Sequence, residues 1–184
     1  DLKFAAPGKD TGKKVAIIGG GVGGLACAYQ LRRMGHAATV FDNHKALGGM
    51  MRYGIPGYRT PRDVMDHEIQ RILDLGVEVR LNTFVGKDIT MEQLRADYDA
   101  VVIAIGAQAG RSIPIPGGDA PNCITGVAFL DAYNDGRLRT VSKRVVVIGG
   151  GDTAMDVVSV ARRLGHIEHA HENERPENII LNQT

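Results

Sequence analysis

Residues 14–24, KVAIIGGGVGG, place an apolar strand directly before the pattern Gly19-x-Gly21-x-x-Gly24. In such a pattern the first glycine permits a tight turn, the second lets the backbone approach a pyrophosphate, and the third lets a helix pack on the strand. A second register, Gly21-x-Gly23-x-x-Ala26, fits the same letters, but a strand that ends at Ile18 favours the first. The stretch therefore predicts a strand, a phosphate-binding turn and a helix.

A second copy of this pattern follows the apolar segment KRVVVIG, as Gly149-x-Gly151-x-x-Ala154. Glycine-rich turns between a strand and a helix also occur for packing alone, so one copy is weak evidence by itself. The first copy has support from Asp42, which ends the strand HAATVFD, where a carboxylate can accept a hydrogen bond from a ribose hydroxyl. Two copies predict two bound dinucleotides.

The remaining pattern predicts an α/β protein with two Rossmann-like units. Hydrophobic spacing, with Gly and Pro at the breaks, predicts helices at 22–34, 62–75, 91–98, 126–136 and 152–164, and strands at 14–18, 36–42, 77–83, 99–106 and 143–149. The run 99–106 is apolar throughout, as in a buried parallel strand. Residues 43–61 form a glycine-rich loop of the kind that is usually functional. After Gly165 the sequence is polar and contains Pro176, so no strand is expected there and the second unit is incomplete.

Composition excludes several classes of protein. The formal net charge of +1 and the absence of basic clusters argue against a nucleic-acid or anionic-membrane partner. No segment reaches the roughly 20 apolar residues that a membrane span requires, and we expect a cytoplasmic protein. Two cysteines, Cys27 and Cys123, without a CxxC pair, argue against a zinc site, a protein-bound cluster or a dithiol reductase. The histidines and glutamates at 166–172 invite a metal interpretation, but a charged surface segment explains them better, so no metal site is predicted.

Five stretches together are similar to the small-subunit family of glutamate synthase, which includes the flavin-bearing part of dihydropyrimidine dehydrogenase. They are VAIIGGGVGGLACAYQLRRMGH, ALGGMMRYGIPGYRTPRDV, LNTFVGKDIT, YDAVVIAIGAQ and VVVIGGGDTAMDV. The loop GGMMRYGIP is the most specific of them. The resemblance implies four parts: residues 1–13 as an N-terminal extension, 14–112 as the first part of an FAD domain, 113–142 as a connector, and 143–184 as the start of an inserted NAD(P)-binding domain.

The resemblance also implies the residues that bind each cofactor. Those implied for FAD are Gly19, Gly21, Val22, Gly23, Gly24, Asp42, Asn43, Leu47, Gly48, Gly49, Arg59, Val85 and Gly106. Those implied for NADPH or NADH are Gly150, Gly151, Asp152 and Thr153. By residue type alone, Asp152 fits a helix cap equally well, and Arg59 fits a solvated loop charge. Many relatives have threonine where this chain has Ile105, so a side-chain hydrogen bond at that place is not expected.

The function that the resemblance implies is hydride transfer from NAD(P)H to FAD, followed by single-electron transfer to iron–sulfur clusters or ferredoxin of a partner. The clusters would lie outside this chain, and no side chain is expected to act as a catalytic acid or nucleophile. Two other classes stay open. One is an FAD-dependent oxygenase or disulfide reductase, and the other is a noncatalytic docking subunit of an electron-transfer complex.

Overall fold

The computed structural model describes residue 4 and residues 6–167 of the 184-residue chain. The chain divides into two compact units. The first unit contains residues 1–51 and 61–107, and the second contains residues 52–60 and 108–184. The short segment 52–60 therefore belongs to the second unit, although the first unit flanks it in sequence.

The first unit is built on a parallel sheet of four strands. Its strands are β1 (Lys14–Ile18), β2 (Ala37–Phe41), β3 (Glu78–Arg80) and β4 (Ala100–Ile103), in the order β3-β2-β1-β4. Each neighbouring pair is parallel. The order reverses beside β1, because β2 pairs with one edge of β1 and β4 with the other. Ligands of such sheets bind beyond the carboxyl ends of the strands at this switch point, and residues 19–24 begin there.

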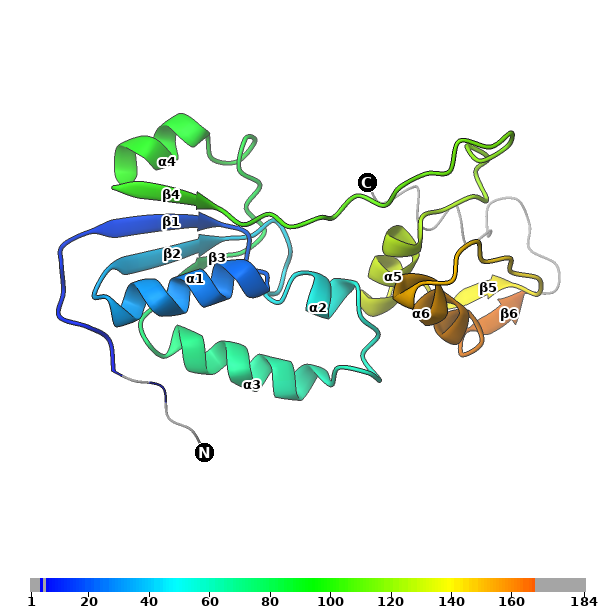
Figure 1. Cartoon of the computed structure of the whole chain (residues 1–184), viewed down its shortest axis with the longest axis horizontal. Helices are drawn as coiled ribbons and strands as arrows, with labels where there is room; N and C mark the ends of the chain where they lie inside the picture. Colours follow the sequence, from blue (N-terminus) through cyan, green and yellow to red (C-terminus); the bar gives the residue numbers. More distant parts are fainter. Residues whose placement is uncertain (1–3, 5, 168–184) are drawn as a thin grey trace. The chain divides into compact units, whose positions relative to one another are not determined.

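Helices cover both faces of this sheet (Figure 1). On one face α1 (Val22–Arg33) and α3 (Arg62–Leu73) contribute Leu25 and Ile69 to a core that includes Ile17 of β1. On the other face α4 (Met91–Asp97) buries Leu94 against Phe41 of β2. The helix predicted at 22–34 is confirmed, and Gly35 ends it with a φ of +86°.

The loop predicted at 43–61 contains one short helix, α2 (Met50–Tyr53). The strand predicted at 77–83 is shorter than expected, because only Glu78–Arg80 pairs with β2. Among the residues that the structure describes, no helix is both long enough and apolar enough to cross a bilayer.

Between residues 108 and 167, the described part of the second unit contains two helices and two short strands. They are α5 (Gly126–Asn134), β5 (Thr140–Ser142), α6 (Asp152–Ala161) and β6 (Gly165–Ile167). The two strands pair in parallel, with Thr140 opposite Gly165. Leu130 of α5 and Val160 of α6 lie in the same buried cluster. The residues predicted as a connector at 113–142 thus supply a helix and a strand to this unit, while the assignment of separate FAD and NAD(P) domains stays a prediction.

Three predictions about strands need correction. The predicted strand at residues 143–149 does not form, because β5 pairs with β6 at residues 140–142 instead, and a strand without a neighbour leaves its backbone groups unpaired. Val146 and Ile148 are consequently 85% and 66% exposed. A strand does form at Gly165–Ile167, which the polar sequence did not lead us to expect. Finally, β4 is an edge strand of the described sheet, so Ile103 is 65% exposed rather than buried.

Candidate dinucleotide sites

The turn at residues 19–24 is shaped by glycines whose missing Cβ atoms leave room for backbone. Gly19 has a φ of +108°, and a Cβ atom built on it would lie 2.4 Å from the carbonyl oxygen of Ala104. A Cβ atom on Gly24 would lie 1.9 Å from the carbonyl oxygen of Gly19. The first and third glycines of the pattern are therefore required by contacts within the protein, as the pattern predicts.

Gly21 and Gly23 differ from these two glycines. A Cβ atom on Gly21 would be in ordinary contact with the Cα atom of Gly49 at 3.7 Å, and one on Gly23 would meet nothing within 4 Å. Gly23 and its neighbour Val22 are exposed. The protein itself does not require glycine for space at position 21, which is the position where the pattern brings the backbone close to a ligand.

The loop at residues 47–49 crosses the first turn. The amide of Gly48 donates to the carbonyl oxygen of Gly20 over 2.8 Å, and a Cβ atom on Gly49 would lie 2.8 Å from the Cα atom of Gly21. Leu47 is buried in the core of the first unit. The structure thus brings together two glycine segments that are far apart in the sequence, with backbone packed against backbone.

Asp42 fixes the first turn from the end of β2. Its carboxylate is 7% exposed, and it accepts hydrogen bonds from the amide of Gly20 (2.6 Å) and from the amide (2.8 Å) and Nδ1 (3.0 Å) of His44. Burial is the largest single influence and raises the pKa of Asp42, but the hydrogen bonds from His44 and Gly20 together lower it below its usual value. A carboxylate has about four acceptor positions, so these three bonds leave one acceptor position unused.

The loops after β3 and β4 complete this end of the sheet. The amide of Thr83 donates to the carbonyl oxygen of Asp42, two residues before the half-buried Val85. Asn43 is exposed beside Asp42. Gly106 has a φ of +66° and is also exposed, beyond the strand whose Ala104 contacts the first turn. The residues predicted for FAD therefore lie at one end of this sheet, apart from Arg59.

The start of α1 suits an anionic ligand. Gly21 is its N-terminal cap and offers no side chain, and the first helical turn carries no acidic residue. The first amide groups of a helix have no partner within the helix, and they sit at the positive end of its dipole. The backbone here therefore has the donors, the sign of charge and the open glycines that a pyrophosphate requires.

The second turn is open in the same way but carries an acid. Gly149 has a φ of +132°, and Cβ atoms on Gly150 and Gly151 would meet nothing within 4 Å. Gly151 is the N-terminal cap of α6, so Asp152 is the first helical residue and not the cap. Thr153 packs closely on α5, since a Cβ atom on Gly126 would lie 3.0 Å from its Cγ2 atom. The glycines fit a dinucleotide, whereas the charge of Asp152 favours the helix dipole and opposes a second anion.

Arg59 lies in the second unit, on segment 52–60. Its Nη1 atom donates to Oδ1 of Asp156 on α6 over 2.6 Å. Hydrogen bonding and charge attraction from Asp156 raise the pKa of Arg59 above its ordinary value, with a smaller contribution from Asp152. Arg59 is thus paired with a carboxylate although its side chain is half-exposed, and its predicted contact with FAD stays a prediction.

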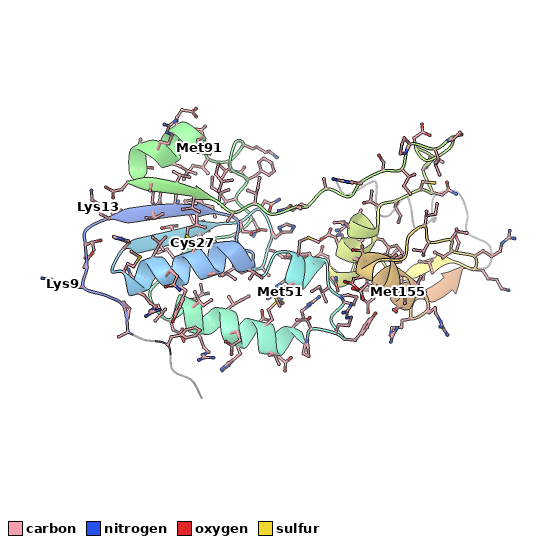
Figure 2. The ribbon with its side chains drawn as sticks, in the orientation of Figure 1. Lys9, Lys13, Cys27, Met51, Met91 and Met155 are labelled. Carbon is pink, nitrogen blue, oxygen red and sulfur yellow. The ribbon has the colours of Figure 1, made fainter. Side chains whose placement is uncertain are left out.

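The structure describes no metal site. No group of three potential ligands occurs among residue 4 and residues 6–167. Of the cluster considered in the sequence, Glu168, His169, His171 and Glu172 lie outside the described residues. Cys27 on α1 (Figure 2) is partly buried, and burial raises the pKa of its thiol. Cys123 is exposed.

Sequence reasoning missed His44 and Asp156. His44 stands two residues after Asp42, a spacing at which an aspartate commonly accepts a hydrogen bond from the backbone. Asp156 stands within the apolar run of α6, four residues after Asp152, and an acid at a position that should be buried requires a partner. Both signals were present in the sequence.

Comparison with known proteins identifies relatives along almost the whole chain. The model of the pyridine nucleotide-disulphide oxidoreductase family matches residues 13–180. The NADP(+)-dependent formate dehydrogenase subunit beta of Moorella thermoacetica is 48% identical over 158 residues, which are 84% of this chain and 22% of that protein. The glutamate synthase [NADPH] small chain of Escherichia coli (strain K12) is 39% identical over 184 residues, covering 93% of this chain and 39% of the relative.

Two further relatives agree with these. The NAD-dependent dihydropyrimidine dehydrogenase subunit PreT of Salmonella typhimurium is 38% identical over 166 residues, which are 89% of this chain and 40% of that protein. The structure of Mycobacterium tuberculosis FprA in complex with NADPH has a TM-score of 0.68 at 25% identity and covers 90% of this chain and 41% of that one. The chain spans less than half the length of each of these relatives.

These matches confirm the resemblance to the glutamate synthase small subunit and the predicted α/β class. They also confirm, at the level of the family, an oxidoreductase that uses FAD and NAD(P)H. The glycine turn at the switch point of a parallel sheet, the second glycine turn and the family match over residues 13–180 lead to one conclusion: the chain belongs to the pyridine nucleotide-disulphide oxidoreductase family.

Proposed function

We propose that this chain is the electron-entry part of a larger flavoprotein, which holds FAD at residues 19–24 and NADPH or NADH at residues 149–153. The observation that carries the proposal is the pair of open glycine turns, each followed by a helix whose glycine cap offers no side chain. Three relatives have NADPH, NADP(+) or NAD in their names, which supports a nicotinamide dinucleotide as the second ligand.

The first turn would hold the pyrophosphate of FAD through backbone amides. Gly21 permits close approach, the start of α1 supplies donors, and Asp42 keeps the turn in place through Gly20. FAD held at this turn would supply the redox chemistry, which is the uptake of an electron pair from a nicotinamide and the release of single electrons. The residues of this chain bind and orient, and none of them needs to donate or accept a proton.

The second turn would hold the nicotinamide dinucleotide through Gly150, Gly151 and Thr153. Asp152 contributes negative charge at the helix start, which favours the helix itself. We propose that electrons leave for iron–sulfur clusters or ferredoxin in a partner. The formate dehydrogenase, glutamate synthase and dihydropyrimidine dehydrogenase relatives are each named as a subunit or chain, which supports a partner protein.

Two alanine variants of the full-length protein test the assignment of one cofactor to each turn. Gly21 and Gly151 have φ values of −77° and −83°, which alanine adopts without strain. A Cβ atom added at either position would have no protein atom closer than 3.7 Å. We expect Gly21→Ala to lose bound FAD while it keeps its fold. We expect Gly151→Ala to keep FAD and to raise the KM for NAD(P)H by about tenfold or more, because a lost close contact of about 1.4 kcal/mol changes affinity tenfold.

The two variants control each other, and the measurements are flavin absorbance, circular dichroism and steady-state kinetics with an artificial acceptor. Loss of FAD from Gly151→Ala with full retention in Gly21→Ala would contradict the assignment. A wild-type protein without flavin would support the noncatalytic docking role instead. If turnover required oxygen and an oxygen atom entered the product, the result would support the alternative of an FAD-dependent oxygenase.

A further inference from the structure

The segment 52–60 is tied to both helices of the second unit. The side-chain amide of Asn134, at the end of α5, donates to the carbonyl oxygen of Tyr53 over 2.9 Å. The guanidinium of Arg163, just after α6, lies 4.2 Å from the centre of the Tyr58 ring. Together with the bond from Arg59 to Asp156, three contacts of different kinds hold this short segment to α5 and α6.

The ion pair is asymmetric in its burial. The side chain of Asp156 is 9% exposed, whereas that of Arg59 is 52% exposed. A buried carboxylate is costly unless a cation or hydrogen-bond donor satisfies it. Asp156 therefore holds the guanidinium of Arg59 at one place on α6, while part of the arginine side chain still faces outward.

The helix that carries Asp156 begins at the second glycine turn. Asp152 is its first residue, and Asp156, which pairs with Arg59, is one turn later on the same face. Arg59, which the family resemblance assigns to FAD, is thus attached to α6, the helix that follows the proposed nicotinamide site. A rigid attachment of this kind sets where Arg59 lies whenever α6 holds its ligand.

We propose that Asp156 is a positioning residue for hydride transfer: it acts through Arg59 and fixes segment 52–60 to the helix that begins at the second dinucleotide turn. Asp156 itself touches neither cofactor in this proposal. The inference rests on the proposed function, since it concerns the transfer between the two cofactors assigned there.

The test measures flavin reduction by NAD(P)H in the full-length flavoprotein, by stopped-flow absorbance without oxygen. Asp156→Asn keeps the shape of the side chain and removes its charge. We expect the rate constant of flavin reduction to fall by roughly 10- to 100-fold, because small misplacements of a positioned group cost about that much. The FAD content should stay unchanged, and the concentration of NAD(P)H that gives half the maximal rate should change by less than about threefold, on the order of 0.6 kcal/mol.

A double-mutant cycle tests whether Asp156 acts through Arg59. In Arg59→Met the same rate constant should fall, and adding Asp156→Asn should lower it little further, because both changes break one contact. Asp131→Asn is the matched control: it removes another ion-paired carboxylate of the same unit, one that pairs with Arg137, and should leave the rate unchanged. If Asp156→Asn does not fold, two other variants carry the test: Arg59→Met, which changes a half-exposed residue, and Asp156→Glu, which keeps the charge. We expect Asp156→Glu to retain more of the flavin-reduction rate than Arg59→Met.

Some outcomes would overturn this inference alone. They are an unchanged reduction rate in Asp156→Asn, purely additive losses in the double mutant, or an equal loss in Asp131→Asn. Failure of the wild-type flavin to be reduced by either nicotinamide would instead remove the proposed function. The two failures are therefore distinguishable.

Discussion

Asp42 shows how one buried side chain can shape a binding turn before any ligand arrives. It accepts hydrogen bonds from Gly20 and His44, and it lies at the end of β2 where the pattern expects a ribose ligand. Its structural role and its proposed binding role use the same carboxylate. The ionised form of Asp42 should therefore matter for the stability of the turn as well as for affinity.

The pH dependence of unfolding tests this point. The folded-state pKa of Asp42 lies below its ordinary value of 3.8, so the folded protein keeps this carboxylate ionised at pH values where the unfolded chain takes up a proton. Asp42 thus contributes stability that is complete above pH 3.8 and is lost as the pH falls through the lower, folded-state value. Urea unfolding at a series of acidic pH values should show a shallower pH dependence for Asp42→Asn than for wild type. Equal slopes would contradict this role.

Gly24 and Gly23 are neighbours with opposite expectations. A Cβ atom at Gly24 would lie 1.9 Å from backbone, so Gly24→Ala should destabilise the protein by about 1–3 kcal/mol or more. Gly23 lies inside α1 with open space around it, so Gly23→Ala should be neutral or stabilise by up to about 1 kcal/mol. Urea unfolding of the two variants without added FAD gives both numbers. A similar loss of unfolding free energy in both variants would contradict this expectation, because only Gly24 has the close backbone contact.

At the scale of elements, the helices follow their local signals closely. In α4 the Thr90 hydroxyl accepts a bond from the amide of Gln93, and the Gln93 side chain accepts one from the amide of Thr90. This reciprocal cap begins the helix at Met91. Gly35 and Gly76 end α1 and α3 with positive φ. These signals act between residues a few positions apart, which is why the sequence predicts where the five predicted helices begin, although each observed helix ends before its predicted last residue.

Removal of the α4 cap is a test at this scale. We expect Thr90→Ala to lower the free energy of unfolding by about 0.5–2 kcal/mol, because the hydroxyl that accepts from the amide of Gln93 is lost. Thr90→Ser keeps the hydroxyl and should restore most of that loss. The measurement is the urea midpoint. A serine variant as unstable as the alanine variant would attribute the effect to the methyl group instead.

Strands follow different rules from helices. The segments 99–106 and 143–149 both contain apolar runs, yet only the first contains a strand, at Ala100–Ile103, because β1 offers it a parallel neighbour. Strand formation depends on a partner that is distant in sequence, so an apolar run alone does not decide it.

At the scale of the whole molecule, the described chain has separate cores. Ile17 is fully buried in the first unit, and Leu130 is 2% exposed in the second. No described residue belongs to both of these buried clusters. Each unit therefore has its own source of hydrophobic stabilisation.

Truncations in the two cores should act independently. Ile17→Ala and Leu130→Ala should each cost about 2–5 kcal/mol in the unit that contains the residue. Their effects in the double variant should add to within about 0.5 kcal/mol, because the sites share no packing partners. Thermal and urea unfolding, followed by hydrogen exchange of each unit, measures these losses. A coupling of more than about 1 kcal/mol would show that the cores are not independent.

The sequence by itself determined the two glycine turns, the α/β class, the family and the described helices other than α2. Each of these depends on near neighbours or on the glycine spacing of a single turn. Tertiary structure alone decided that Asp42 is bonded to Gly20 and His44, that Arg59 pairs with Asp156, and that residues 143–149 have no strand partner among the described residues. These outcomes depend on which distant segments meet, and on the cost of burying a charge or a backbone group without a partner.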